Sequence, residues 1–481
     1  MELIRLREQN LYWENPREIG NDPHLETLAS FPLEIVNPVE KSVNLNKDGI
    51  FIIRGPRQVG KTTFLKRIVK ELLKQGINPK RIFYFALDIG GLRNEQEVLD
   101  LINTYLSWIR KEVKDRVWIF LDEVTYTPNW AIGLKTAYDQ GFLRKVTCIA
   151  TGSSSIDLKR GGERLPGRRG NLGEKADLTM LPVDFKTFLK SCFLKEKEIP
   201  SLNSFQKEEI YHLACEISFY GKEIKEAFDT YLSVGGYPLS INLYLQKSMV
   251  DNNAYYTYLQ AILGDLTKIR KREVFFREIA SIVISKKFEP VDWQTISQST
   301  SIGSHSTVQS YVEDLTYLFV LDVLYPFRFL GGKQISFIKR RKIYFLDPFI
   351  FHTLNSWCAG SPQPFNYSLR WLENPENKAK LAENVAISQL KKLFAQSGFW
   401  RNEREIDFIG FSEEGPQLYL EIKYQSQITS YDKRPLKKVG GGIILSKDLL
   451  SFDEKNNILI VPLPYFLALL GFETATFQEN L

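Results

Sequence analysis

A glycine-rich octapeptide is the strongest chemical signal in the sequence. It runs from Gly55 to Thr62 and fits the pattern G-x-x-x-x-G-K-[ST] in full. Glycine at both ends lets the backbone curl so that successive N–H groups face phosphate oxygens, and a following helix adds its positive dipole end. We expect Lys61 to bridge the β- and γ-phosphates of ATP and the Thr62 hydroxyl to ligate Mg²⁺. The predicted nucleotide-binding residues are Gly55, Pro56, Arg57, Gln58, Val59, Gly60, Lys61, Thr62 and Thr63.

Two adjacent acids follow an apolar strand predicted at residues 117–121. Asp122 is expected to hold Mg²⁺ through water, and Glu123 to orient and activate the attacking water. A further strand, at residues 81–88, comes between the P-loop strand and this one along the chain. The added strand and the second acid favour ATP hydrolysis coupled to motion over a small-molecule kinase. The chain lacks the Asn-Lys-x-Asp signature of a GTPase, and a purely structural acid pair is the alternative.

The next predicted strand, at residues 146–150, ends in Thr-Gly-Ser-Ser-Ser. Because neighbouring parallel strands end at the same edge of a sheet, a polar side chain here is expected beside Asp122. Such a side chain could contact the γ-phosphate or the attacking water. Ser153 and Ser154 are both candidates, and a simple turn is the alternative.

Residues 164–169, downstream of these serines, include arginines at positions 164, 168 and 169. An arginine can stabilise the charge that develops in the transition state, either from its own chain or from a neighbouring subunit. Arg168 is the first choice for this catalytic role, and a solvated loop is the alternative. Because a neighbouring subunit could supply this arginine, the sequence also allows a homo-oligomer.

A second group of candidate catalytic residues lies near the C-terminus. Asp407 is followed one strand later by Glu421-Ile-Lys423, an order typical of metal-dependent nucleases with a PD-(D/E)xK core. Glu421 and Lys423 share a face because side chains alternate along a strand. Asp407 and Glu421 could hold Mg²⁺ while Lys423 positions or deprotonates a water, with Glu383 as an accessory acid. Ile406 stands where this pattern usually has proline, and a surface charge pair is the alternative.

Alternating strands and helices over residues 50–151 predict a parallel sheet covered by helices. After residue 181 the pattern is mostly helical and predicts a lid. Residues 273–327 suit a winged helix-turn-helix, although plain interdomain packing is the alternative for such a unit. A looser stretch at residues 359–378 predicts a linker before a small mixed α/β domain. The helix of the winged unit that would meet phosphates or base edges of DNA begins with Ser306, Thr307, Gln309 and Ser310.

The composition of the chain excludes few kinds of function. The net charge of +6 over 481 residues permits a nucleic-acid partner without arguing for one. Basic runs at residues 268–272, 339–342 and 433–438 are expected to be solvated faces. The four cysteines form no Cys-x-x-Cys pair, so we expect no disulfide framework or zinc site and a reducing cytoplasm. The longest apolar run, residues 460–472, is shorter than the ~20 residues that span a bilayer, so no membrane segment is predicted.

Taken together, these motifs resemble a family of archaeal and bacterial AAA-type P-loop ATPases that carry a C-terminal restriction-endonuclease-like domain of unassigned function. The resemblance rests on the P-loop, the Phe-Leu-Asp-Glu strand end, the serine-rich strand end, the Gly167-Arg168 step and the Gly235-Gly236-Tyr237-Pro238 turn. It implies an α/β fold in four parts: an ATPase domain with an N-terminal extension (residues 1–190), a helical lid (191–268), a winged-helix domain (269–358), and a linker with a nuclease-like domain (359–481).

The sequence thus predicts an Mg²⁺-dependent ATPase that binds ATP and ADP and couples hydrolysis to conformational change. It is expected to act on DNA or on a DNA-bound partner, with a metal-dependent nuclease site at the C-terminus. The alternative is an ATP-controlled signalling switch whose C-terminal domain is an inert docking surface.

Overall fold

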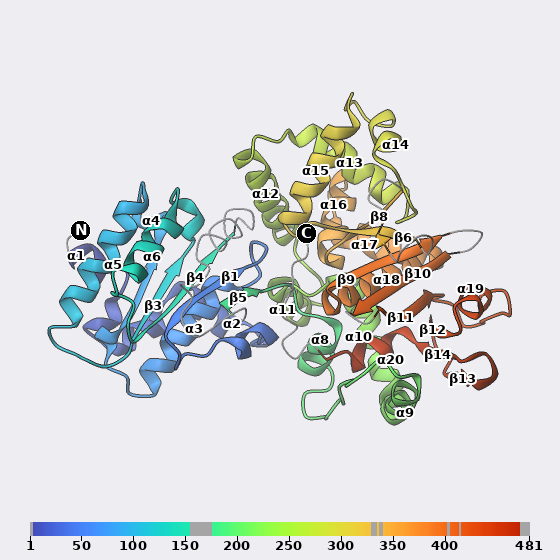
Figure 1. Ribbon diagram of the computed structural model, residues 1–481, viewed down its shortest axis with the longest axis horizontal. Helices are drawn as coiled ribbons and strands as arrows, with labels where there is room; N and C mark the ends of the chain where they lie inside the picture. The colour runs from blue at the N-terminus through green and yellow to red at the C-terminus, as the bar shows by residue number, and fades with distance from the viewer. Residues whose placement is uncertain are drawn as a thin grey trace. The chain divides into compact units, whose positions relative to one another are not determined.

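The computed structural model describes residues 3–153, 176–328, 334–335, 340–401, 405–412 and 415–471. The chain divides into two units between Leu181 and Pro182 (Figure 1). None of the helices in these ranges is both long and apolar enough to cross a membrane. The four cysteines are free thiols, as the sequence predicts.

A parallel five-stranded sheet forms the centre of the first unit. Its strand order is β2-β3-β4-β1-β5, and all four pairings are parallel. Strands β1 to β4 are buried along their whole length because helices lie on both faces (Figure 1). The predicted parallel sheet is therefore confirmed. The strands are β1 (Gly49–Arg54), β2 (Ile82–Ala86), β3 (Val117–Asp122), β4 (Val146–Gly152) and β5 (Asp177–Thr179).

The helices of this unit follow the predicted pattern with shifted ends. The strand expected at residues 81–88 ends at Ala86 and gives way to a short helix that ends at Gly90. Although β2 comes between β1 and β3 along the chain, β4 lies between them in the sheet. The helices are α1 (Leu3–Glu8), α2 (Pro23–Ser30), α3 (Lys61–Lys74), α4 (Leu87–Gly90), α5 (Glu95–Ile109) and α6 (Trp130–Asp139).

The N-terminal extension covers the open edge of the sheet at β2. The buried Asn10 side chain accepts a hydrogen bond from the Tyr84 N–H and donates one to the Tyr84 carbonyl oxygen, both at 2.8 Å. Gln9 accepts one from the Ala86 N–H at 2.7 Å. These two amides therefore satisfy backbone groups that an edge strand would otherwise leave unpaired.

The second unit begins with helices and ends with a mixed sheet. Helices precede, separate and follow its strands, and several of them start at a proline, which suits the first helical position. The helices are α8 (Phe185–Cys192), α9 (Lys207–Ile217), α10 (Gly221–Val234), α11 (Pro238–Lys247), α12 (Asn252–Lys268), α13 (Glu273–Ser285), α14 (Trp293–Gln298), α15 (His305–Tyr317), α16 (Pro348–Ala359), α17 (Pro364–Glu373), α18 (Pro375–Leu390), α19 (Arg434–Lys438) and α20 (Leu463–Leu469).

The predicted linker at residues 359–378 is wrong, because helices α17 and α18 occupy most of that stretch. Its Pro and Asn residues are helix-start signals. Pro364 and Pro375 stand at the first turns, and the Asn374 side chain caps α18 by accepting hydrogen bonds from two backbone N–H groups. The Pro and Asn residues that suggested a linker therefore mark the starts of two helices.

A nine-stranded sheet runs through the described part of the second unit. The order is β13-β14-β12-β11-β10-β9-β6-β7, and β8 pairs with β6. β6 also pairs in parallel with β9 at Tyr325 and Pro326, which joins the strand of the predicted wing to the C-terminal strands. Gly398 permits this approach, since a Cβ there would lie 2.8 Å from the Tyr325 carbonyl oxygen. The strands are β6 (Leu321–Arg328), β7 (Gln334–Ile335), β8 (Lys342–Phe345), β9 (Gln396–Arg401), β10 (Glu405–Ser412), β11 (Gly415–Ile422), β12 (Gly442–Ser446), β13 (Ser451–Asp453) and β14 (Ile458–Pro462).

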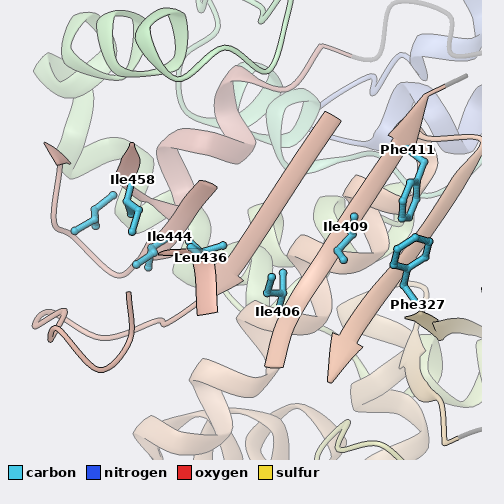
Figure 2. Packing of buried hydrophobic residues seen from close by; sticks show 8 residues of the cluster. Phe327, Ile406, Ile409, Phe411, Leu436, Ile444 and Ile458 are labelled. Carbon is cyan, nitrogen blue, oxygen red and sulfur yellow. The ribbon is translucent and has the colours of Figure 1, made fainter. Parts of the chain in front are cut away.

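One face of this sheet carries an apolar cluster, shown in Figure 2. Its Ile406 side chain is fully buried, and because neighbours along a strand point to opposite faces, Asp407 lies on the other face. The buried members come from β6, β10, β12, β14 and α19: Phe327, Ile406, Ile409, Phe411, Leu436, Ile444, Ile458 and Ile460.

The Gly-Gly-Tyr-Pro turn connects α10 to α11 and is tied to two distant segments. The Gly236 N–H donates to the Asp347 carboxylate at 2.8 Å, and the Gly236 carbonyl accepts from the Val183 N–H at 2.9 Å. Gly235 has a φ of +68°. A Cβ on Gly236 would lie 2.1 Å from the Val183 carbonyl oxygen, so glycine is required by close backbone contact.

Candidate active site

The P-loop joins the end of β1 to the start of α3. Gly60 has a φ of +105° and stands at the N-cap of α3, whose first residue is Lys61. Gln58 also adopts a left-handed conformation, with a φ of +62°. A Cβ on Gly55 would lie 2.0 Å from the Met180 carbonyl oxygen, so this position needs glycine. The strand–loop–helix context that the motif predicts is therefore present.

Lys61 lies within the curl of this loop. Its ammonium donates hydrogen bonds to the carbonyl oxygens of Gly55 and Pro56, each at 2.8 Å, and the residue is 5% exposed. A buried ammonium needs such acceptors because it has left water. The positive charge is therefore held next to the loop amides and the N-terminus of α3, where phosphate oxygens are expected.

Asp122 ends β3 with both carboxylate oxygens engaged. One oxygen accepts a hydrogen bond from the Tyr84 hydroxyl at 2.9 Å, and the other accepts from the Thr151 hydroxyl and from the Glu123 N–H. Burial raises the pKa of Tyr84 well above its usual range and the Asp122 charge raises it further, so the phenol remains a donor. β3 lies between β2 and β4 in the sheet, so hydroxyl groups from both neighbouring strands reach Asp122.

Glu123 is held separately from Asp122. It adopts a left-handed backbone conformation with a φ of +49°, and its carboxylate accepts a hydrogen bond from the Ser153 hydroxyl at 3.1 Å. Burial raises the pKa of Glu123, while the nearby charges of Lys61 and Arg57 lower it. The predicted proximity of the β4 end to the acid pair is thus observed, with Ser153 on Glu123 and Thr151 on Asp122. Ser154 and Arg168 lie outside the described residues.

These oxygen donors suit Mg²⁺. The hydroxyl of Thr62, in the first turn of α3, and the carboxylate of Asp122 are the hard ligands that Mg²⁺ prefers, and this ion usually keeps several waters. Asp122 already accepts hydrogen bonds on both oxygens, which fits the predicted contact through metal-bound water rather than direct ligation.

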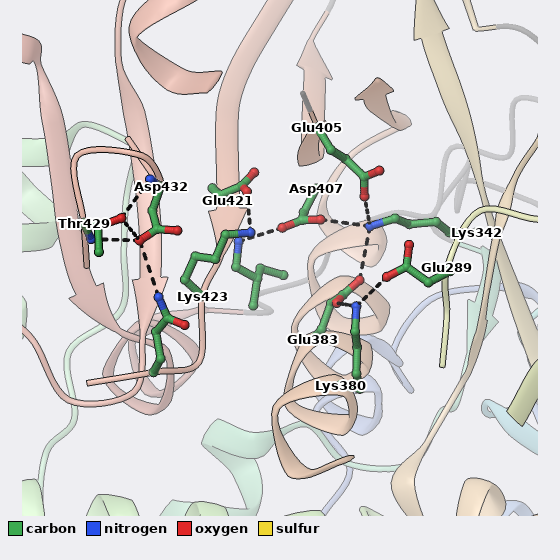
Figure 3. Close-up of polar contacts among 12 residues, drawn as sticks. Glu289, Lys342, Lys380, Glu383, Glu405, Asp407, Glu421, Lys423, Thr429 and Asp432 are labelled. Carbon is green, nitrogen blue, oxygen red and sulfur yellow. Dashed lines mark hydrogen bonds and ion pairs between the residues drawn. The ribbon is translucent and has the colours of Figure 1, made fainter. Parts of the chain in front are cut away.

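The C-terminal candidates also come together, as Figure 3 shows. Glu383 from α18 and Asp407 from β10 lie on the same side of the sheet as Glu421, and Lys423 pairs with Glu421 at 2.6 Å. One carboxylate oxygen of Asp407 accepts a hydrogen bond from the Ile422 N–H at 2.9 Å. Burial raises the pKa of Glu421 well above its usual range, and the Asp407 charge raises it further.

A further residue, Lys342 of β8, stands among these acids. Its ammonium lies 2.8 Å from Asp407, 2.5 Å from Glu405 and 3.2 Å from Glu383 (Figure 3). Burial lowers the pKa of Lys342, but the charges of Asp407 and Glu383 outweigh it and leave the pKa well above the usual value. The expectation that residues 339–342 form a solvated face is wrong for Arg341 and Lys342, which are each 2% exposed.

The residues of this centre do not fit the predicted Mg²⁺ site. Within the described ranges, no group of three or more His, Cys, Asp or Glu residues is arranged to hold a metal ion. Asp407 accepts hydrogen bonds from the Lys342 ammonium and the Ile422 N–H, so the cation beside this carboxylate is a lysine.

The first turns of α15 carry polar side chains. Ser306, Gln309 and Ser310 are exposed. Gln309 donates a hydrogen bond to Glu313 at 2.8 Å, and Lys271 donates one to Ser310 at 2.7 Å. Glu313 is also exposed, so the surface of α15 carries hydroxyl, amide and carboxylate groups.

Comparison with known protein families identifies two segments. Residues 47–189 match the AAA domain family, and residues 225–360 match a domain of unknown function (DUF8612). The first segment contains the P-loop, the acid pair and Ser153. An AAA-type P-loop domain is therefore present in this chain, and it supports the predicted ATP binding. The second segment runs from α10 to the residue after α16, and its family description assigns no activity.

An uncharacterized protein of Methanocaldococcus jannaschii is 24% identical over 459 residues, which cover 90% of this chain and 87% of that protein. A Walker-type ATPase of Pyrococcus abyssi has a similar structure with 13% identity and a TM-score of 0.38, covering 66% of this chain and 93% of that one. The Aeropyrum pernix ORC1 protein in complex with DNA has 10% identity and a TM-score of 0.30, covering 74% and 97%. These low scores assign no substrate.

Proposed function

We propose that this AAA-type protein hydrolyses ATP with Mg²⁺ and couples hydrolysis to conformational change. The observation that supports it most directly is the pairing of a loop-held Lys61 with two separately positioned acids, Asp122 and Glu123. A purely structural acid pair would not need hydroxyl groups from two neighbouring strands to hold it at the sheet edge.

In this mechanism each residue has one task. Lys61 would bind the phosphates of ATP, and Thr62 and Asp122 would hold the metal ion, Asp122 through water. Glu123 accepts the proton of the attacking water, and the Ser153 hydroxyl holds the Glu123 carboxylate in place. Mg²⁺, when bound, would neutralise part of the phosphate charge.

ATP turnover and nucleotide binding test this proposal together. Lys61→Ala is expected to lose ATP binding, because the phosphate cation is gone. Glu123→Gln is expected to bind ATP with little change and to lose turnover by about 100-fold, the usual contribution of a general base. Lys74→Ala is the matched control, since this lysine ends the same helix with a side chain that is 64% exposed. Undiminished turnover in Glu123→Gln would rule the mechanism out.

We propose DNA, or a protein bound to DNA, as the macromolecule on which the cytoplasmic ATPase acts. The support is the exposed polar start of α15. Turnover should rise several-fold with single-stranded, double-stranded or branched DNA, and Ser306→Glu should reduce that rise without changing the basal rate. A turnover that none of these DNAs changes would contradict the proposal.

One observation favours a second candidate function. Because Lys342 stands among the C-terminal acids, an inert C-terminal docking domain under ATP control agrees with the structure better than a nuclease does. This switch predicts measurable ATP binding, a turnover that DNA leaves flat, and no cleavage of nucleic acid. A homo-oligomer, with Arg168 acting across subunits, stays a proposal that size measurements with and without ATP would test.

A further inference from the structure

Lys342 is the centre of a closed ionic group. A lysine ammonium has three N–H donors and no acceptor. Here three carboxylates, from Glu383, Glu405 and Asp407, lie within 3.2 Å of it, one for each donor (Figure 3). The lysine is 2% exposed, so these acids replace the water that it has lost.

The other acids of the group also have ammonium partners. Lys380 lies 3.2 Å from the second oxygen of Glu383 and 3.0 Å from Glu289. Lys423 lies 2.6 Å from Glu421. The remaining Glu421 oxygen is buried and has no hydrogen-bond partner among the described residues. Mg²⁺ is usually bound through one or two carboxylates and several waters, but here the neighbouring carboxylates are already paired with ammonium groups.

The lysine and its acids come from different parts of the second unit. Lys342 opens β8, which pairs only with β6 among the described strands. Glu383 lies on α18, and Glu405 and Asp407 lie on β10. β8 belongs to the segment that matches the domain of unknown function, whereas α18 and β10 follow that segment in the chain. The ion group therefore connects the matched segment to the part of the chain that follows it.

We infer that Lys342 is the built-in cation of this acidic centre: it takes the place of a divalent metal ion and fastens β8 to α18 and β10. The centre is then an ionic joint of the second unit and not a cleavage site. This inference goes beyond the ATPase proposal and does not depend on it, because it concerns residues of the second unit alone.

Manganese binding to the nucleotide-free full-length chain tests the inference. The wild type and Asp407→Asn should bind the same number of Mn²⁺ ions, since the centre holds none. Lys342→Met removes the ammonium while keeping the length of the side chain, and it should gain about one equivalent of Mn²⁺. That equivalent should vanish again in Lys342→Met/Asp407→Asn. Lys222→Met, whose side chain is 85% exposed, is the control and should gain nothing.

Two results would overturn the inference. One is wild-type Mn²⁺ binding that Asp407→Asn abolishes, because it would place a metal beside Lys342. The other is a folded Lys342→Met variant, checked by circular dichroism, that gains no Mn²⁺. Should Lys342→Met not fold, the comparison of the wild type with Asp407→Asn decides alone. None of these measurements uses ATP, so a failed ATPase proposal and a failed inference can be told apart.

Discussion

At the scale of single residues, hydroxyl groups decide where the two acids of the nucleotide site point. Tyr84 and Thr151 hold Asp122, and Ser153 holds Glu123. Each acid is therefore held by protein groups, which reduces the reorganisation needed for hydrolysis. Tyr84 also stacks its ring under the Lys66 ammonium at 3.4 Å, which limits its own movement.

Tyr84→Phe is expected to lower kcat for ATP about tenfold while the affinity for ATP changes little. The reason is that a hydrogen bond to a charged group contributes about 1.5 kcal/mol, and Asp122 loses one here. Steady-state turnover and equilibrium ATP binding measure the two quantities. Tyr105→Phe is the control, because its buried hydroxyl donates to the Lys80 carbonyl oxygen, away from the acids. Equal losses of kcat in the two variants would show that Tyr84 acts through stability only.

The spacing of residues could predict part of this site. Lys61, Thr62, Asp122 and Glu123 follow from a motif and a strand end, because their roles depend on positions close together in the chain. Tyr84 could not be found that way, since its contact with Asp122 depends on which strands pair. Lys342 was hidden for another reason: a basic run carries no sign of which member is buried.

At the scale of elements, the Gly-Gly-Tyr-Pro turn joins α10 to the loop before α16 and to the segment before α8 through Asp347 and Val183. The sequence marks this turn only as a family resemblance. The structure supplies a physical reason for its second glycine, which is the lack of space beside the Val183 carbonyl oxygen.

Gly236→Ala is expected to destabilise the protein by about 2 kcal/mol, because the added Cβ would lie 2.1 Å from a backbone oxygen and force a shift. Thermal and urea unfolding measure the change. Gly264→Ala is the control: this glycine is an exposed residue of α12 with no atom within 4 Å of the added Cβ, and alanine should leave stability equal or higher. Equal midpoints for the two variants would contradict the steric account.

Helix and strand types were predictable where apolar periodicity is strong, as in β1, α3 and β3. The ends of helices and strands were harder to predict. Helix α5, for example, stops at Ile109 with no Gly or Pro nearby to mark its end. The joining of β6 to β9 could not be predicted from local pattern. It depends on a backbone approach at Gly398 between residues about 70 positions apart.

At the scale of the whole molecule, buried ionisable groups make stability depend on pH. His352 of α16 is fully buried, and its Nε2 contacts the Leu232 carbonyl oxygen at 2.8 Å. Burial lowers the pKa of His352 to about 4 from its usual 6.5. The unfolded chain therefore takes up this proton first as the pH falls.

His352 is expected to add nothing to the pH dependence above pH 6.5, where it is neutral in both states. Between pH 6.5 and 4 it should reduce the free energy of unfolding, by up to about 3 kcal/mol in total. Urea midpoints measured across this range should fall less steeply in His352→Gln, whose amide can still donate to Leu232. Parallel curves for the two proteins would show that another group causes the loss of stability at low pH.

The shared sheet also decides how the second unit can be handled as a recombinant protein. A gene fragment covering only residues 225–360 would contain β6 but none of the strands from β9 onward. The backbone groups of Tyr325 and Pro326 would then face solvent, and Lys342 would lose all three of its carboxylates. An open strand edge beside a buried charge invites self-association, so soluble expression of that region calls for the chain from residue 182 onward.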